Sequence, residues 1–188
     1  MPTAFEREVK LKFTSRAAAR AAVAACDAAP KRDRRLQRDA LLDTAEGWLR
    51  DRGSLLRVRM EDGRTVLTFK GPVQPSAMKL REEIEMEVSD GAALLGLLER
   101  LGFRVWFRYE KYREEFALGS VVIAIDETPI GTYVEIEGDE AGIEGVARAL
   151  GRTPADFVLD SYRGLFARSC EARGVEATDM VFAPGHEN

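Results

Sequence analysis

The feature that most constrains this chain is a strand-like segment at residues 5–13 in which charged and apolar side chains alternate. Successive side chains on a strand point to opposite faces. The charged face carries Glu6, Glu8, Lys10 and Lys12. The other face is apolar except for Arg7. An ordinary half-buried strand would turn this apolar face inward and leave the charges in water, so the later strands must decide the orientation.

Seven further segments have the length and residue types of strands. Two of them, residues 55–61 and 64–70, are joined by Asp62-Gly63, which is a strong hairpin signal. The other five are expected at residues 36–43, 81–88, 105–116, 120–126 and 132–137. Most of these segments repeat the alternation of charged and apolar residues, so the first strand is not an isolated case.

Four helices are expected between and after these strands. They cover residues 15–26, 92–101, 139–150 and 154–173. Each helix carries an apolar stripe that needs a surface to cover. Residues 30–35 are predicted to form a basic loop and residues 47–53 a turn-rich connection. In the tail, Val181-Phe182 is the expected anchor.

These elements predict an α+β fold, an eight-stranded antiparallel β-barrel that forms a tunnel with helices packed outside. If the helices cover the apolar faces of the strands, the charged faces line the interior. Closing the sheet also removes its exposed edges. A chain of 188 residues suits one domain. We expect that domain over residues 1–174, followed by a C-terminal tail at residues 175–188.

The predicted lumen contains acids and bases in equal number. The acids are Glu6, Glu8, Glu83, Glu85, Asp126, Glu135 and Glu137. The bases are Lys10, Arg57, Arg59, Lys70, Arg81, Lys111 and Arg113. Unpaired charges in a dry interior cost several kcal/mol each, so such a lumen must hold water, ions or a charged ligand. The formal net charge of −4 argues against a strongly basic nucleic-acid-binding protein.

The residue types indicate which ligand the lumen would hold. Carboxylates without histidine or cysteine favour a hard cation such as Mg²⁺ or Mn²⁺. Lysine and arginine side chains are the groups that grip polyphosphate oxygens. Together they describe a site for a metal-bound polyphosphate. The only histidine, His186, lies near the end of the chain, so triad chemistry and histidine-ligated zinc are disfavoured.

Two further features predict a cytoplasmic protein. Cys26 and Cys170 lie in separate helical segments without metal-ligand spacing, as expected for buried thiols in a reducing compartment. No apolar run approaches the ~20 residues of a membrane helix, and no signal-peptide pattern begins the chain. We therefore expect no membrane partner.

At this point the motifs match a known family. The segment Glu6-Arg7-Glu8-Val9-Lys10 is an ExExK signature. It is followed in order by Leu56-Arg57-Val58-Arg59, Leu67-Thr68-Phe69-Lys70-Gly71-Pro72, Arg81-Glu82-Glu83-Ile84-Glu85, Lys111-Tyr112-Arg113, Asp126-Glu127, residues 131–138 and Ser161-Tyr162. The set resembles the CYTH superfamily, or triphosphate tunnel metalloenzymes. This superfamily includes class IV adenylyl cyclases, thiamine triphosphatases, inorganic tripolyphosphatases and some RNA triphosphatases.

The resemblance implies a role for each lumen residue. The implied metal ligands, for one or two ions, are Glu6, Glu8, Glu135 and Glu137, with Glu83, Glu85 and Asp126 as further acids. The implied triphosphate-binding residues are Lys10, Arg57, Arg59, Lys70, Lys111 and Arg113, assisted by Arg81. Catalysis would depend chiefly on Glu6, Glu8, Lys10, Arg57, Arg59 and Lys70. In this scheme one metal ion orients the phosphates and a second activates the nucleophile.

The reaction itself stays open among several alternatives. We favour metal-dependent hydrolysis of the terminal phosphate of tripolyphosphate, thiamine triphosphate or ATP. The alternatives are a class IV adenylyl cyclase, which converts ATP to cyclic AMP and pyrophosphate, and a non-catalytic polyphosphate sensor. The basic segment at residues 31–38 would suit an RNA 5′-triphosphatase, but such a charge run is more often a solvated loop. Nucleic acid is therefore disfavoured as a partner, and a homodimer is compatible with the size of the domain.

Aromatic contacts to a nucleotide base are weakly indicated. Many relatives have a Tyr-Phe pair where this chain has Leu41-Leu42 before Asp43. Phe107, Tyr109 and Tyr133 could stack on a base, but the core interpretation is favoured for each of them.

Overall fold

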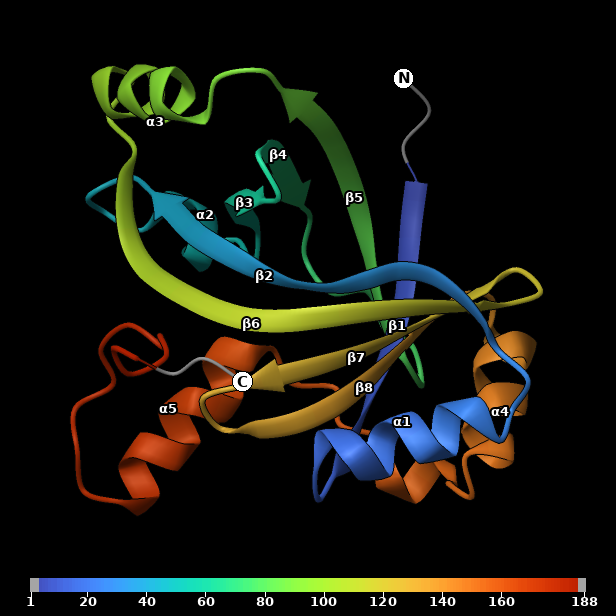
Figure 1. Cartoon of the computed structure of the whole chain (residues 1–188). Coiled ribbons are helices and arrows are strands. Elements are labelled where there is room, and N and C mark those ends of the chain that lie inside the picture. Colours follow the sequence, from blue (N-terminus) through green and yellow to red (C-terminus); the bar gives the residue numbers. More distant parts are fainter. Residues whose placement is uncertain (1–3, 186–188) are drawn as a thin grey trace.

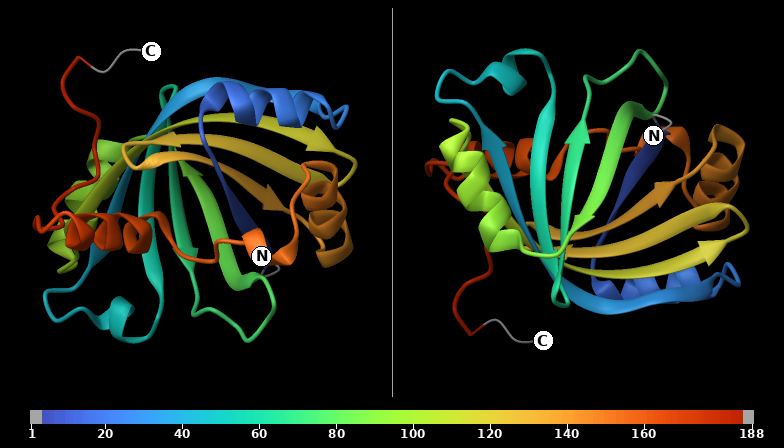
Figure 2. Two further views of the ribbon diagram at one scale, coloured as in Figure 1. Left: turned by 90° about the horizontal axis from the view of Figure 1, so that it is seen from below. Right: turned by 90° about the horizontal axis from the view of Figure 1, so that it is seen from above.

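Eight antiparallel strands close into one barrel, which confirms the predicted fold class (Figures 1 and 2). The structure is a computed structural model and describes residues 4–185. Around the barrel the strand order is β1-β5-β4-β3-β2-β6-β7-β8, so every strand pairs on both sides. The strands are β1 (Ala4–Phe13), β2 (Ala29–Asp43), β3 (Leu55–Glu61), β4 (Arg64–Lys70), β5 (Lys79–Val88), β6 (Arg104–Leu118), β7 (Val121–Thr128) and β8 (Gly131–Glu137).

Five α-helices and a 3₁₀ turn lie outside the strands (Figure 1). They are α1 (Arg16–Ala24), α2 (Trp48–Asp51), α3 (Gly91–Arg100), α4 (Glu140–Ala149), the 3₁₀ turn η1 (Pro154–Asp156) and α5 (Tyr162–Ala172). The side chains of Ser15, Asp90 and Asp139 cap α1, α3 and α4, each accepting a hydrogen bond from a backbone N–H three residues on. The short helix α2 was not predicted.

Local turn chemistry sets the best-predicted boundaries. Asp62 and Gly63 both adopt positive φ angles, 46° and 74°, as a two-residue hairpin turn that matches strand twist requires. The flanking strands β3 and β4 therefore begin and end where the sequence indicated.

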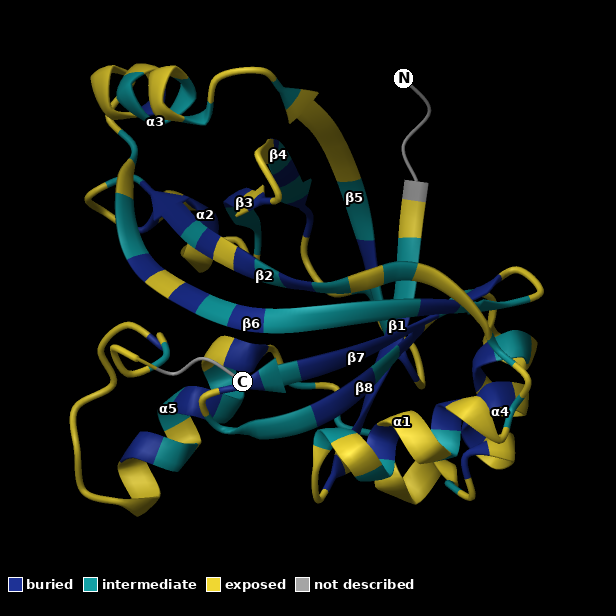
Figure 3. Cartoon of the chain, viewed as in Figure 1, coloured by how far each residue is buried: buried dark blue, intermediate teal, exposed yellow. Residues whose placement is uncertain are grey.

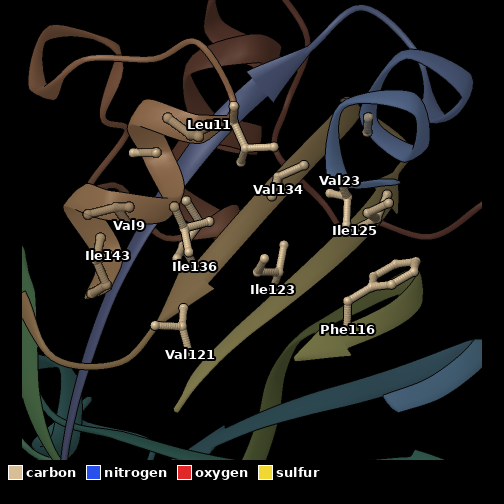
Figure 4. Close-up of a cluster of buried hydrophobic side chains, with 14 of the residues drawn as sticks. Val9, Leu11, Val23, Phe116, Val121, Ile123, Ile125, Val134, Ile136 and Ile143 are labelled. Atoms are coloured by element: carbon tan, nitrogen blue, oxygen red, sulfur yellow. The ribbon is translucent and has the colours of Figure 1, made fainter. Parts of the chain in front are cut away.

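The main hydrophobic core lies on the outer face of β1, β7 and β8, under α1 and α4. Val9 and Leu11 of β1 are fully buried there. In Figure 4 the side chains of Val9, Ile136 and Ile143 lie close together between the sheet and the helix. The apolar face of the first strand thus points outward under helices, and its charged face is left to the barrel interior, as predicted.

A smaller core lies under α3, where Leu98 packs with Leu42 and Val58 of β2 and β3. The outer face of β5 is not covered in the same way. Ile84 is 40% exposed and Met86 47% exposed. In Figure 3 one end of β5 has the colour of exposed residues. The expectation that helices cover every apolar strand face is therefore wrong for β5.

The basic segment at residues 30–35 is part of strand β2, not a loop. Irregular pairing with β6 between Pro30 and Arg35 lets the strand bend while it continues. Its arginines are tied to acids on other strands: Arg34 to Glu127, and Arg35 to Glu115. Ion pairs across the sheet, which local sequence cannot reveal, hold this segment in the barrel.

The predicted helix at residues 154–173 is also interrupted. Only residues 154–156 form a helical turn, and the chain then runs extended until Ser161 caps α5. In the extended part, the backbones of Val158 and Lys10 exchange two hydrogen bonds of 3.2 and 2.8 Å. The interruption therefore places the N-terminus of α5 near the lumen.

Of the predicted anchor in the C-terminal segment, Val181 is 46% exposed, whereas the Phe182 ring lies 5.3 Å from that of Tyr112 and its backbone N–H donates to Glu110 at 3.2 Å. Met180 is 1% exposed, and its backbone pairs with β6 at Arg108 and Glu110. Cys170 is buried and Cys26 half-buried, both as free thiols. His186 lies outside the described residues. Among those described, no helix is long and apolar enough to cross a membrane.

Candidate functional site

The inward-facing side chains of the barrel enclose a cavity of about 600 Å³, called the lumen below. The lumen is lined by all but one of the fourteen charged residues that the sequence assigned to it. The exception is Asp126, which is fully buried behind the lining residues. The alternation rule therefore places the charged face of each strand correctly, whereas the role of each residue stays a prediction.

Lys10 lies between two acids of the lumen wall, Glu8 and Glu135. Its Nζ atom lies 2.9 Å from Glu8 and 3.0 Å from Glu135, and the side chain is 2% exposed. Burial disfavours the ammonium form, but the two carboxylates outweigh burial and raise the pKa of Lys10. Lys79, which the sequence analysis missed, lies 2.6 Å from Glu8 on the other side.

Asp126 is the acceptor for three lumen groups. Lys111 lies 2.7 Å away, Arg113 binds both carboxylate oxygens at 2.7 and 2.6 Å, and the Tyr162 hydroxyl donates at 2.7 Å. Arg113 also contacts Glu135. Burial, together with the neighbouring charge of Arg113, lowers the pKa of Lys111 to about 8. Tyr162 is the first residue of α5, so this bond fastens the helix over one part of the lumen.

Arg57 and Arg59 of β3 share an acid that the sequence analysis missed. Arg59 donates to Asp39 at 2.8 Å, and Arg57 lies 3.6 Å from the same oxygen. Asp39 is 3% exposed. Glu85 is held further along by Arg57 at 3.2 Å and by the Thr68 hydroxyl at 2.7 Å.

The acids Glu6, Glu83 and Glu137 are less well compensated. Lys70 contacts Glu6 and lies 3.2 Å from Glu83. Burial, and then the nearby charge of Glu6, raise the pKa of Glu83 to about 8. The same two causes raise the pKa of Glu137 to about 7. Lys70 and, at 3.9 Å from Glu83, Arg57 do not offset the burial of three neighbouring carboxyls, so ionisation of all three is disfavoured. We call this group the acidic cluster.

Arg81 has a different environment from the other lumen bases. Its guanidinium donates to the backbone carbonyls of Gly71 at 2.6 Å and of Gly53 at 2.8 Å. These bonds tie two loops together at the edge of the lumen. Few hydrogen-bond donors of Arg81 therefore remain for a ligand in the lumen.

A further group, around Glu61, lines the same lumen and was not predicted. Glu61 accepts hydrogen bonds from Arg32 at 2.6 Å, Arg35 at 2.9 Å and Gln37 at 2.5 Å. Burial acts to raise the pKa of Glu61, but these three donors outweigh it and lower the pKa to about 2. We call these four residues the Glu61 cluster.

Most of the missed lumen residues could have been found from the strand period. Lys79 shares the parity of Arg81 and Glu83 but precedes the predicted strand start. Asp39 and Gln37 alternate with outward-facing residues on β2, but on this strand only residues 41–43 were considered as possible ligand contacts. Tyr162 was noted only as part of a motif, because its side chain reaches the lumen from a helix rather than a strand.

The acidic side chains of the lumen offer only oxygen ligands, which are the ligands that a hard divalent cation prefers. The raised pKa values of Glu83 and Glu137 are a second observation in favour of a cation there, because a bound cation would stabilise their ionised forms. Within residues 4–185, however, no three acidic, histidine or cysteine side chains already converge as a set of metal ligands. The carboxylates point at lysines and arginines instead, so a metal ion would have to displace these ion pairs.

The closed barrel, the charged lumen and the helices outside define a tunnel-type β-barrel protein. A family model described as the CYTH domain matches residues 4–153, so the chain belongs to the CYTH domain family.

Related proteins agree with this assignment. A protein of Methanocaldococcus jannaschii, named "Putative adenylate cyclase MJ0240", is 30% identical over 105 residues, which are 55% of this chain. The match spans only 60% of that relative. The fold is similar to that of a structure from Vibrio parahaemolyticus named "a putative adenylate cyclase", with a TM-score of 0.75 at 21% identity, covering 88% of this chain and 99% of that one. It is also similar to that of a Hippeastrum protein named "Putative adenylyl cyclase HpAC1" and described as having a dominant triphosphatase activity, with a TM-score of 0.61 at 19% identity, covering 98% and 99%.

Proposed function

We propose that this chain hydrolyses the terminal phosphate of a triphosphate that it binds in the lumen together with a divalent metal ion, Mg²⁺ or Mn²⁺. The observation that carries the proposal is a cavity inside a closed barrel, lined by buried lysines and arginines beside the three carboxyls of the acidic cluster. Phosphoryl transfer needs mainly positioning and neutralisation of charge, which such a lining supplies.

Binding would exchange one set of ion pairs for another. Lys10, Lys70 and Arg113 now donate to carboxylates, and each can donate to a phosphate oxygen instead. The carboxylates released in this way, with the acidic cluster, would hold the metal ion. When bound, the metal neutralises phosphate charge and lowers the pKa of a bound water. Tyr162 keeps Asp126 in place during the exchange.

Cyclisation of ATP is the second candidate, because the relative from Methanocaldococcus jannaschii is named as an adenylate cyclase. A cyclase uses the ribose 3′-hydroxyl as the nucleophile and releases pyrophosphate. The Hippeastrum protein combines both descriptions, so the name alone does not decide between the two reactions.

A product assay tests the proposal. The full chain is incubated with tripolyphosphate, thiamine triphosphate, ATP and GTP in Mg²⁺ or Mn²⁺, and phosphate, pyrophosphate and cyclic nucleotides are quantified. Release of phosphate alone supports hydrolysis, and pyrophosphate with a cyclic nucleotide supports the cyclase. Chelation of the metal should abolish turnover and re-addition should restore it. Tight tripolyphosphate binding without any product would leave the non-catalytic sensor and overturn the proposal.

A variant distinguishes phosphate release in the lumen from the activity of a contaminating phosphatase. Glu6→Ala removes one carboxylate of the acidic cluster and should abolish metal-dependent turnover. Glu87→Ala, an exposed acid paired with Arg64 on the same barrel, is the matched control. Full turnover by Glu6→Ala would refute the assignment of the lumen as the active site.

A further inference from the structure

A second cavity of about 250 Å³ adjoins one end of the lumen, between β6, α5 and the C-terminal segment. Trp106 and Arg163 line both cavities, so they form a wall that the two share. Phe107 and Phe166 give the smaller cavity apolar walls, and Asp179 adds a carboxylate. A flat ring with polar edges matches these surroundings.

A bulge in β6 puts Trp106 in this wall. Leu41 pairs with Phe107, but the next residue, Leu42, pairs with Val105, so Trp106 has no partner on β2. Bulges re-aim side chains in this way, often beside functional sites. The guanidinium groups of Arg50 and Arg163 lie 4.5 and 4.6 Å from the centre of the indole ring.

Arg163 differs from every other lysine and arginine that lines the described lumen. Each of the others contacts a carboxylate or, in the case of Arg81, backbone carbonyls, and Arg50 is held by Asp43 at 3.0 Å. Within residues 4–185, Arg163 has only its stacking contact with Trp106. The residue is exposed, and its partial burial and the charge of Arg50 lower its pKa. Its hydrogen-bond donors are therefore available to a ligand.

We propose that this end of the lumen binds the base of a nucleoside triphosphate and that it prefers guanine. The inference rests on the proposed function, in which the triphosphate itself occupies the lumen. A guanidinium matches the N7 and O6 acceptors of guanine. Asp179 accepts from the Arg108 backbone N–H at 2.7 Å through Oδ1, and its Oδ2, 3.8 Å from the Arg108 guanidinium, can accept from the ring and amino N–H groups of guanine. The guanidinium plane of Arg163, which is itself stacked on the Trp106 indole, offers its other face to a base.

The same groups disfavour other triphosphates. Adenine presents an amino donor where guanine has O6, so it cannot accept the same pair of hydrogen bonds from Arg163. The cationic ring of thiamine would be repelled by Arg50 and Arg163. Inorganic tripolyphosphate has no group that reaches this site. The expected order of affinity among the organic triphosphates is GTP, then ATP, then thiamine triphosphate.

Calorimetric titration of the full chain with these four compounds in Mg²⁺ tests the order. We expect GTP to bind about tenfold more tightly than ATP. Arg163→Ala should lower the ratio of GTP affinity to tripolyphosphate affinity about ten- to a hundredfold. Arg168→Ala, an exposed arginine on the same helix that pairs with Asp160, is the matched control and should keep the ratio. In a Trp48→Phe background, where Trp106 is the only indole, GTP should quench the tryptophan fluorescence.

The outcomes separate this inference from the proposed function. If tripolyphosphate binds but GTP binds no more tightly than ATP or thiamine triphosphate, the base site is refuted and the lumen assignment stands. An affinity ratio that Arg163→Ala leaves unchanged also refutes the base site. If no triphosphate binds at all, the proposed function fails first and the base site fails with it.

Discussion

The acidic cluster and the Glu61 cluster are built from the same residue types in one barrel, but their charges are balanced differently. Glu61 has three donors, Arg32, Arg35 and Gln37, and its pKa falls to about 2. Glu83 has Lys70 on one side and a second acid on the other, and its pKa rises to about 8.

Burial works in the same direction on both acids, because desolvation always disfavours a carboxylate. The neighbours therefore decide the difference. In the Glu61 cluster three hydrogen-bond donors outweigh the cost of burying the acid, so the cluster stabilises the fold. In the acidic cluster the neighbours do not offset the cost of burial, and a bound cation would stabilise the ionised carboxylates. Acids with raised pKa values of this kind are common in binding sites. The predictions below test this distinction.

Loss of a buried lumen base should have the largest effect on activity. Lys10→Met removes the ammonium that lies between Glu8 and Glu135, and we expect kcat/KM for the triphosphate to fall about 10²- to 10³-fold. Steady-state kinetics with a thermal melt of each variant measures this. Lys12→Met is the matched control, since Lys12 lies on the same strand but is exposed. Equal losses in the two variants would mean that Lys10 has no special role.

Neutralising an acid of the acidic cluster should separate activity from stability. Glu83→Gln is expected to lower metal-dependent turnover roughly 10- to 100-fold. The same change relieves repulsion from Glu6, so the metal-free protein should become more stable by about 1 kcal/mol. Urea denaturation in a chelator gives the stability, and kinetics in Mg²⁺ gives the turnover. A loss of stability in the metal-free protein would show that the cluster is complete without a cation.

The sequence predicts the barrel and its lumen well because both follow from a local rule. A period of two puts every second side chain of a strand inside, and this needs no knowledge of distant partners. Boundaries are accurate where a strong turn signal marks them, as at Asp62-Gly63. The helix caps at Ser15 and Asp90 are also local features, and the helices that they begin lie where the sequence predicts them.

The failures all involve partners far away in the sequence. The segment at residues 30–35 has the composition of a loop, but its backbone pairs with β6, and Arg35 also forms ion pairs with Glu61 and Glu115. The predicted last helix is interrupted where the backbone of Val158 pairs with β1 at Lys10. The position of Trp106 depends on a bulge, which no local pattern indicates.

Breaking the Glu61 cluster should affect stability more than activity. Glu61→Gln leaves Arg32 and Arg35 without their shared carboxylate, and the free energy of unfolding at neutral pH should fall by about 1–3 kcal/mol. Urea denaturation measures the change. The exposed pair of Glu87 and Arg64 supplies the control, because Glu87→Gln should cause a clearly smaller loss. A large drop in turnover per folded Glu61→Gln molecule would place Glu61 in the active site instead.

The pH dependence of that stability difference is the smallest effect and the sharpest test of the comparison. The pKa of Glu61 is lowered from its ordinary value of 4.5 to about 2, so the folded state favours the carboxylate. Its contribution to stability is fully present above pH 4.5 and is lost as the pH falls toward 2. The difference in unfolding free energy between wild type and Glu61→Gln should therefore be constant from pH 7 to pH 5 and shrink between pH 4.5 and the acid limit of folding. Denaturation curves at half-unit intervals measure it. A difference that grows on acidification would mean that Glu61, like Glu83, is held against its charge.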